Sequence, residues 1–581
     1  TISFVLLALW TARHLDHNLL PWALTAYLIF AGLHTVFPLL LERRQPESTP
    51  TWWSQIFPPV TLLLMLVPLL KVEDVSLLFW PAILLVDILA IGLAVISASL
   101  TAVAAVLVLT LMAAAVSLLK LPVTGGLEPS LVLVIGGFAV FFFAASMWLV
   151  RKLGDRLPTI DQAGGNIFGD ARSQIPAFAS LLPFILLIMA CARLTVPDPT
   201  MIFGLGLLLV VLTLGLTRIM TCASEKSGDE SPAMSKVEWL PACTLAGMAA
   251  LEYAWHARQF DPAYASGPLS WYLGFYLLFA IYPFLFRSSF AGLTGPWAVA
   301  ALSGLAHFWM AYSAIKLAWP NEFIGVIPAV FALAPLISLV IVLRTSPTDS
   351  AARLNQLAWF GATALFFITL IFPIQFDRQW LTVAWALEGA ALLWLFQRVP
   401  HPGLRAVGTI LLCTAFVRLA LNPAVFSYHA RSETPILNWY LYAYGLTIVA
   451  LFYGARLLAP PRERTLGINA PPLFSALGVV LAFLLLNIEI ADYFTAAGRE
   501  VHTFKFSGNF AHDMTYTIAW AIFALGLLVA GIWRKARIAR YAAIALLSVA
   551  LLKLFFHDLA RLEALYRIGA LFAVAIIAIL A

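Results

Sequence analysis

The chain has 581 residues, of which 62% are hydrophobic and only 11% are charged. An average soluble domain carries about 25% charged residues, so this composition excludes a water-soluble fold. The net charge of +6 is explained below by the placement of Lys and Arg around membrane spans, and it does not require a nucleic-acid partner.

Apolar runs of about 18 to 25 residues recur along the chain, and each can cross a hydrocarbon core roughly 30 Å thick. Strands of a membrane barrel alternate in polarity, whereas 205–211 and 479–486 are apolar on every side, so the spans are helical. The sequence predicts an all-α, polytopic transmembrane protein of about 20 spans without a large soluble domain. The expected spans are 1–13, 18–41, 54–70, 75–97, 98–119, 129–150, 175–196, 200–217, 237–256, 268–286, 291–316, 323–343, 354–374, 380–397, 404–421, 437–455, 470–491, 516–533, 540–556 and 563–581.

The division between the fourth and fifth spans depends only on Ser97, Ser99 and Thr101. Both ends of the chain fall inside apolar runs, so we expect them to be trimmed. We distinguish an N-terminal multi-span region, 1–360, from a C-terminal one, 361–581, and expect the two to form one continuous membrane domain.

Lys and Arg indicate the orientation of the spans, because they favour the cytoplasmic side of short loops. The connections from an even-numbered span to the next odd one hold 21 of the 35 basic residues, which leaves 14 (35 − 21) for the other face. With an even number of spans, this asymmetry predicts that both observed ends lie on the cytoplasmic side.

No catalytic motif is present: the sequence lacks H-x-x-x-H, G-x-S-x-G, C-x-x-C and a Walker loop. Cysteines at 191, 222, 243 and 413 have neither metal spacing nor an obvious disulfide pair. The dipeptides at 512–513 and 557–558 are both His-Asp, but neighbours on a helix point about 100° apart, so neither chelates a metal by itself. The sequence therefore leans against an enzyme, and we expect no metal and no cofactor.

A helical hairpin is repeated in the C-terminal region. The run Thr382-Val-Ala-Trp-Ala386 recurs as Thr517-Ile-Ala-Trp-Ala521, at an offset of 135 (517 − 382). Without a gap, the same offset aligns Arg405 with Arg540 and Arg418 with Lys553. We predict a duplicated hairpin, 382–421 and 517–556.

Several odd-numbered spans end in a cation. The carbonyls exposed at a helix C-terminus favour a cation, which can also reach the membrane interface. Alternatively, these cations converge on an anionic group in a cavity open to the outer face. The cations are Lys120, Arg193, Lys316, Arg418 and Lys553.

Acids, amides and imidazoles gather at the same level as these cations, which favours an outward polar cavity. Glu388 differs, because it lies about eight residues, or roughly 12 Å, into its span. A charge there would be costly in lipid, so Glu388 must have a partner, hold a proton or line water; Asp87 is a similar case. The candidate cavity residues are Glu252, Lys316, Glu388, Arg418, Asn422, Glu489, Asp492, Lys553, His557 and Asp558.

The C-terminal region resembles a known family. The runs Trp385-Ala-Leu-Glu388, Asn487-Ile-Glu489-Ile, Thr517-Ile-Ala-Trp520 and Lys553-Leu-Phe-Phe-His-Asp558 are similar to those of a bacterial family of predicted multi-span membrane proteins, domain of unknown function 2339. The resemblance covers roughly 361–581 and implies a protein of the bacterial inner membrane. It implies no activity.

Three functions remain open on the sequence alone. The first is a carrier or flippase-like protein that takes an anionic or lipid-linked component of the cell envelope into the outward cavity. The second is a membrane-embedded transferase that modifies an envelope component, with Glu489 or Asp558 as a base. The third is a non-catalytic scaffold, for which the polar layer would be internally paired. Membrane lipids are partners in each case.

Overall fold

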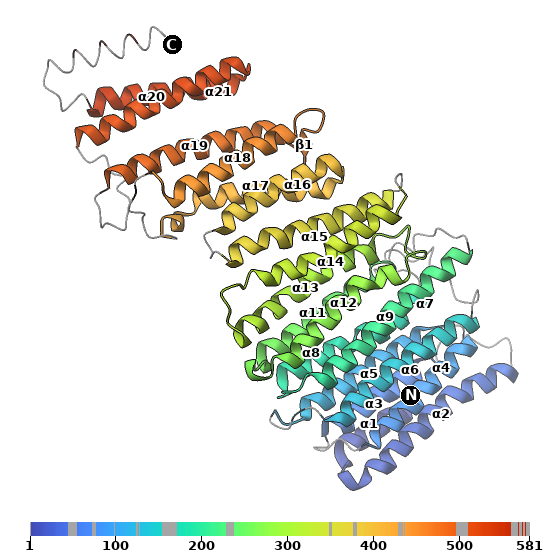
Figure 1. Ribbon diagram of the computed structural model, residues 1–581. Helices are drawn as coiled ribbons and strands as arrows, with labels where there is room; N and C mark the ends of the chain where they lie inside the picture. Colours follow the sequence, from blue (N-terminus) through green and yellow to red (C-terminus); the bar gives the residue numbers. More distant parts are fainter. Residues whose placement is uncertain are drawn as a thin grey trace. The chain divides into compact units, whose positions relative to one another are not determined.

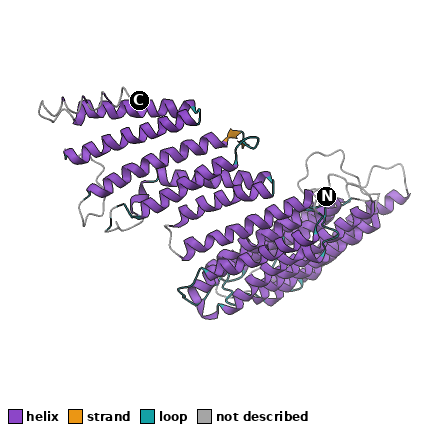
Figure 2. Cartoon of the chain, turned by 45° about the horizontal axis from the view of Figure 1, so that its top comes forward, coloured by secondary structure: helices purple, strands orange, loops and turns teal. Residues whose placement is uncertain are grey.

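The computed structural model is almost entirely helical, as Figure 2 shows, which confirms the all-α class. It describes residues 2–558, except 45–54, 72–76, 98, 124–125, 127, 154–170, 228–236, 348–350, 376–379, 428–433, 435 and 496–508, and three isolated residues beyond.

Contacts divide the chain into two units, and the division falls inside α14 and α15. Unit 1 is Thr1–Glu322 with Ile337–Thr363, and unit 2 is Phe323–Leu336 with Ala364–Ala581. The two sequence regions predicted above also meet inside α15, at residue 360. That these regions form one membrane domain stays a prediction.

Unit 1 is built from long helices around a core of aliphatic and aromatic side chains, among them Phe203, Trp255, Tyr272 and Phe275. The elements up to the shared helices are α1 (Ile2–His14), η1 (His17–Leu19), α2 (Leu20–Arg44), α3 (Phe57–Lys71), α4 (Phe79–Ser97), α5 (Thr101–Lys120), α6 (Pro129–Leu153), α7 (Ala171–Leu181), α8 (Pro183–Arg193), α9 (Thr200–Ser227), α11 (Leu240–Gln259), η4 (Pro262–Tyr264), α12 (Ser266–Leu285) and α13 (Gly295–Ala318). The shared helices are α14 (Val326–Thr345) and α15 (Ala351–Gln375).

In unit 2 each helix after α15 lies beside the next, as Figure 1 shows, and the two helices of each hairpin pack closely against each other. A two-residue antiparallel pair of strands connects α18 to α19. The elements are α16 (Leu381–Arg398), α17 (Pro402–Leu421), η6 (Pro423–Ser427), α18 (Trp439–Leu457), β1 (Arg464–Thr465), β2 (Ile468–Asn469), α19 (Ala470–Phe494), α20 (Phe510–Trp533), α21 (Arg537–Lys553) and a π-helical turn, η7 (Leu554–Asp558).

The helices agree with the predicted spans. Among the described residues, 14 helical segments are long and apolar enough to cross a membrane, and α1 and α3 are shorter apolar helices. Helices α11, α16 and α18 are of similar length but are not among these 14 segments. The break expected between the fourth and fifth spans is real, since α4 ends at Ser97 and α5 begins at Thr101. The last predicted span, 563–581, lies outside the described residues apart from three isolated positions.

Polar side chains begin several helices, because the first N–H groups of a helix lack partners within it. Asn438 Oδ1 accepts a hydrogen bond from Leu441 N, and Asn509 Oδ1 accepts one from Ala511 N. Before α9, Asp198 accepts hydrogen bonds from the N–H and hydroxyl of Thr200, which hold the pKa of Asp198 below its ordinary value.

Candidate functional site

Lys553, at the end of α21, lies at the centre of a buried polar cluster between α20 and η7. Its Nζ donates to both oxygens of Asp558, at 2.9 and 3.1 Å, and to the hydroxyl of Thr517 at 2.8 Å. It also donates to the backbone carbonyl of Asp513 at 2.7 Å. The Lys553–Asp558 ion pair is therefore fixed by the two neighbouring elements, and both side chains are buried.

The π-helical turn η7 explains why Lys553 meets Asp558. In such a turn a residue bonds to the one five positions earlier, so positions 553 and 558 lie one turn apart. In a regular α-helix, residues five apart point in different directions. The change of helix type thus creates an ion pair that α-helical spacing would not give.

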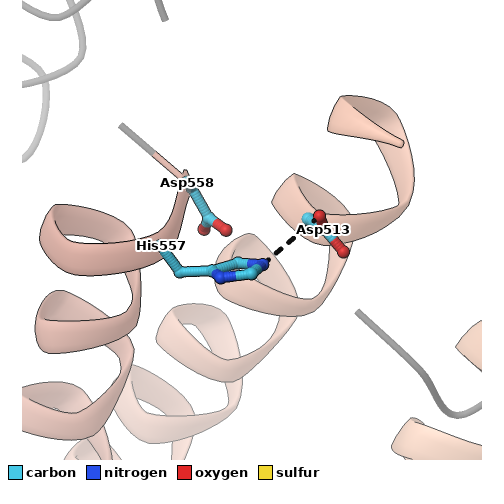
Figure 3. Close-up of side chains that lie close together, drawn as sticks. All are labelled: Asp513, His557 and Asp558. Carbon is cyan, nitrogen blue, oxygen red and sulfur yellow. Dashed lines mark ion pairs between the residues drawn. The ribbon is translucent and has the colours of Figure 1, made fainter. Parts of the chain in front are cut away.

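Asp513 and His557 complete the cluster, as Figure 3 shows. His557 Nε2 lies 3.5 Å from Asp513 Oδ2, and Asp513 Oδ1 accepts no hydrogen bond from a described residue. Asp513, His557 and Asp558 offer potential ligand atoms within 4.8 Å of one another. A metal ion would nevertheless have to displace the ammonium of Lys553 from Asp558, so we assign no metal to this cluster.

A second cluster joins α18 to α19. The Nδ2 of Asn438 donates to Glu489 Oε2 at 3.0 Å and to Asp492 Oδ2 at 3.1 Å, while its Oδ1 caps α18. One amide thus connects two carboxyl groups and begins a helix. Asn438 and Asp492 are buried.

Replacing Asn438 by Asp is expected to lower the free energy of unfolding by about 2 kcal/mol at neutral pH. Aspartate caps a helix as well as asparagine does, but it would put a third carboxylate between Glu489 and Asp492. The loss should shrink as the pH falls, because protonation removes the repulsion. Unfolding of the purified chain in detergent measures both effects, and Asn438→Ser is the control that keeps a cap without adding charge. Equal stability of the two variants at neutral pH would contradict this account.

The two clusters are neighbours. Trp520 Nε1 donates to Asn487 Oδ1 at 2.9 Å, and the rings of Phe494 and His512 lie 4.6 Å apart, so the end of α19 meets the start of α20. We call the group formed by Glu489, Asp492, Asp513, Asp558 and Lys553 the acid layer. It has four carboxyl groups and one ammonium, an excess of acid that sequence spacing alone did not reveal.

Glu388 lies in α16 and pairs with neither Arg418 nor Lys553 among the described residues. Its Oε2 accepts a hydrogen bond from the hydroxyl of Thr369 on α15 at 3.2 Å, and its side chain is buried. Asp87 in α4 has a similar environment, because Thr110 on α5 donates to its two oxygens at 3.1 and 3.2 Å. Both acids thus have a neutral hydroxyl as their partner.

The other predicted site residues have local roles in the structure. The guanidinium of Arg418 lies 5.3 Å from the ring centre of Trp385, and Lys316 Nζ lies 5.6 Å from that of Tyr312. Asn422 Oδ1 accepts a hydrogen bond from Ala424 N, which shapes the turn after α17. Lys316 and Glu252 belong to unit 1, whereas the other eight candidates belong to unit 2.

Cations at helix ends do bind exposed carbonyl groups. Lys71 Nζ donates to the carbonyl of Ala12, near the end of α1, at 2.8 Å. Arg193 donates to the carbonyl of Leu121, directly after α5, at 3.3 Å. Arg193 is one of the span-ending cations named from the sequence, and its contact supports the capping interpretation, although the capped helix is a neighbouring one.

Sequence reasoning missed Asn438, Thr517 and the acceptor role of Asp513. In the sequence, Thr517 stands out only as part of the repeated hairpin. Asn438 carried the one available signal, an asparagine directly before an apolar run, which predicts a helix cap but not its contact with two acids.

Comparison with known proteins finds a similar family for the C-terminal part of the chain. Residues 396–581 match the family described as predicted membrane protein (DUF2339). The match confirms the resemblance over this part. The matched residues include α17 and α18, which pack against α16, and all five residues of the acid layer. No curated protein and no solved structure matches the chain. The chain is thus an integral membrane protein that contacts membrane lipids, and its activity must be argued from its residues.

Proposed function

We propose that this chain is a membrane transporter in which carboxyl groups inside the spans bind and release protons. The observation that carries the proposal is the environment of Glu388, which is buried within α16 and has the hydroxyl of Thr369 as its hydrogen-bond partner. Ionisable groups at membrane depth are costly, and proton relays in pumps and transporters are built from them.

The physical argument concerns the two protonation states of Glu388. Without a cation as partner, a carboxylate in a buried, apolar setting costs several kcal/mol, whereas the protonated acid is neutral. The acid will therefore hold its proton in this conformation and release it when a rearrangement admits water or a cation. Such a difference in proton affinity between two states couples proton movement to a conformational change.

The charge of the acid layer indicates which kind of substrate the proposed transporter would bind. An anionic or lipid-linked envelope component, as expected from the sequence, would need a cation to bind, but Lys553 already pairs with Asp558. Four carboxyl groups around one ammonium favour a substrate that carries a positive charge or hydrogen-bond donors. On the orientation predicted from Lys and Arg, this layer faces outward and both ends of the chain lie in the cytoplasm of a bacterium.

A scaffold without transport is the second candidate. The observation that favours it is the pairing inside the acid layer, where the Nζ of Lys553 donates to Asp513, Thr517 and Asp558. A polar layer that only holds helices together would have this arrangement.

Proton movement into liposomes separates the two candidates. The purified full chain is placed in vesicles that contain a pH-sensitive dye, and an inside-negative potential is imposed. We expect wild type to acidify the interior several-fold faster than empty vesicles, and Glu388→Gln to fall to the empty-vesicle rate. Glutamine has nearly the same volume and still accepts from Thr369, so folding should be retained.

Glu128→Gln is the matched control, because Glu128 is an exposed carboxyl group in the loop before α6. It should acidify the vesicles at the wild-type rate. Wild-type vesicles that behave like empty ones would favour the scaffold, and equal rates for wild type and Glu388→Gln would remove Glu388 from the mechanism.

A further inference from the structure

Glu252 on α11 and His307 on α13 form a buried pair inside unit 1. His307 Nε2 lies 3.4 Å from Glu252 Oε2, and neither side chain has any solvent exposure. Each residue is twelve positions from the start of its helix, or about 18 Å at 1.5 Å per residue. Both residues therefore lie inside their helices, with Glu252 seven residues, or about 10 Å, before the end of α11.

The hydrogen bond of the other ring nitrogen fixes where one proton sits. His307 Nδ1 lies 2.8 Å from the backbone carbonyl of Ser303. A carbonyl oxygen can only accept, so Nδ1 carries a hydrogen and donates it. The Nε2 atom is left facing the carboxyl group of Glu252.

One further proton then satisfies the Glu252–His307 pair. If Glu252 holds the proton, it can donate to Nε2 of a neutral imidazole; if Nε2 holds it, a carboxylate faces an imidazolium. Both forms have no net charge. A second added proton would make the pair cationic, and removal of the shared one would make it anionic. Either change places an uncompensated charge in a fully buried site, at a cost of several kcal/mol.

In this geometry the carboxyl group of Glu252 makes no hydrogen bond of ordinary length to a described residue. At 3.4 Å the contact is longer than an ordinary hydrogen bond, and neither oxygen of Glu252 has a hydrogen-bond partner among the described residues. Buried polar atoms of this kind are rare, and each needs a physical explanation. A group that exchanges a proton, and moves by a few tenths of an ångström when it does so, is such an explanation.

Polar groups lead from the Glu252–His307 pair toward the C-terminal end of α11. His256, one turn after Glu252, lies 3.1 Å from the hydroxyl of Tyr272 on α12 through Nδ1. Its Nε2 lies 3.1 Å from the hydroxyl of Ser313 on α13. No described Lys or Arg pairs with Glu252 or His307, and the ring of Phe279 packs against His307.

We propose that Glu252 and His307 form a proton-binding site in unit 1, which holds one shared proton and exchanges it with the C-terminal end of α11 past His256. The ligand of this site is the proton itself. The site is separate from Glu388 and from the acid layer, which belong to unit 2. It does not depend on transport, because it can be tested on the chain in detergent.

Infrared spectroscopy of the purified full chain tests the shared proton. Difference spectra between wild type and Glu252→Gln, recorded at the same neutral pH, should contain a carboxyl band that is absent from the variant and shifted in frequency in His307→Gln. Asp261→Asn, which changes an exposed carboxyl group after α11, should retain the band. Nitrogen spectra of labelled histidine should show that His307 keeps the hydrogen on Nδ1 throughout.

Hydrogen–deuterium exchange of the same band tests the route. We expect exchange to be several-fold slower in His256→Gln and in the milder variant Ser313→Ala than in wild type. A band unaffected by Glu252→Gln, or a Glu252 band with the same frequency in wild type and His307→Gln, would overturn the shared proton. Unchanged exchange in both route variants would overturn the path past His256.

Discussion

Replacing Lys553 by Met is expected to lower the free energy of unfolding by about 3 kcal/mol. The variant would remove the ammonium that binds both oxygens of Asp558 and leave that carboxyl group, whose side chain is fully buried, without a cation. The loss should not exceed about 3 kcal/mol, because the hydroxyl of Thr517 still donates a hydrogen bond to Asp558 at 2.5 Å. Denaturant unfolding in detergent, followed by circular dichroism, measures the effect.

The double variant Lys553→Met with Asp558→Leu should recover most of the lost stability, since it removes the buried charge together with its partner. Lys535→Met is the matched control, because Lys535 is an exposed lysine in the turn between α20 and α21. If Lys553→Met and Lys535→Met unfold at the same denaturant concentration, the ion pair contributes nothing to stability.

The class of protein and the existence of its spans could be predicted because lipid imposes a simple rule. A segment that crosses the hydrocarbon core must be apolar over its whole length and must satisfy its backbone within one helix. That rule acts on each segment separately, so composition and run length suffice. The break after Ser97 was found in the same way, from a short run of hydroxyl residues.

The partners of the polar residues could not be predicted, because they depend on which helices meet and at what register. The sequence places Lys553 among ten cavity candidates without assigning it a partner, and the π-helical turn η7 brings it to Asp558. His307 pairs with an acid 55 positions earlier (307 − 252), on a helix that is not its neighbour in sequence. The sequence shows how far along a helix each of these residues lies, but only the packing of the helices determines which residue it contacts.

Close packing of α16 on α17 leads to the second large effect, which concerns Gly389 and Gly408. A Cβ added at Gly408 would lie 2.9 Å from the carbonyl oxygen of Gly389, and one added at Gly389 would lie 3.0 Å from that of Gly408. Backbone atoms cannot move aside as a flexible side chain can. The two helices therefore approach each other at glycine, as small residues allow in membranes.

The variant Gly408→Leu is expected to separate α16 from α17 and to cost about 3 kcal/mol. Leucine favours a helix over glycine by nearly 1 kcal/mol, so the steric cost must exceed that gain. Gly445→Leu measures the gain alone, because a Cβ at Gly445 in α18 would meet nothing within 4 Å. We expect Gly445→Leu to be neutral or stabilising in denaturant unfolding, and a similar result for Gly408→Leu would refute the close contact.

The positions of the helix ends and of the small packing residues can be compared between the two copies of the proposed duplicated hairpin. Helix α16 ends at Arg398 and α20 at Trp533 (398 + 135), and α17 begins at Pro402 and α21 at Arg537 (402 + 135). The counterparts of Gly389 and Gly408 at this offset are Ala524 and Ala543, which are small and almost fully buried.

If the two hairpins are copies, Ala543→Leu should destabilise the chain as Gly408→Leu does, by about 2 kcal/mol because alanine already holds the helices slightly apart. Ala542→Leu on the neighbouring position of α21 is its control. Equal unfolding of these two alanine variants would mean that the second hairpin does not reuse the packing of the first.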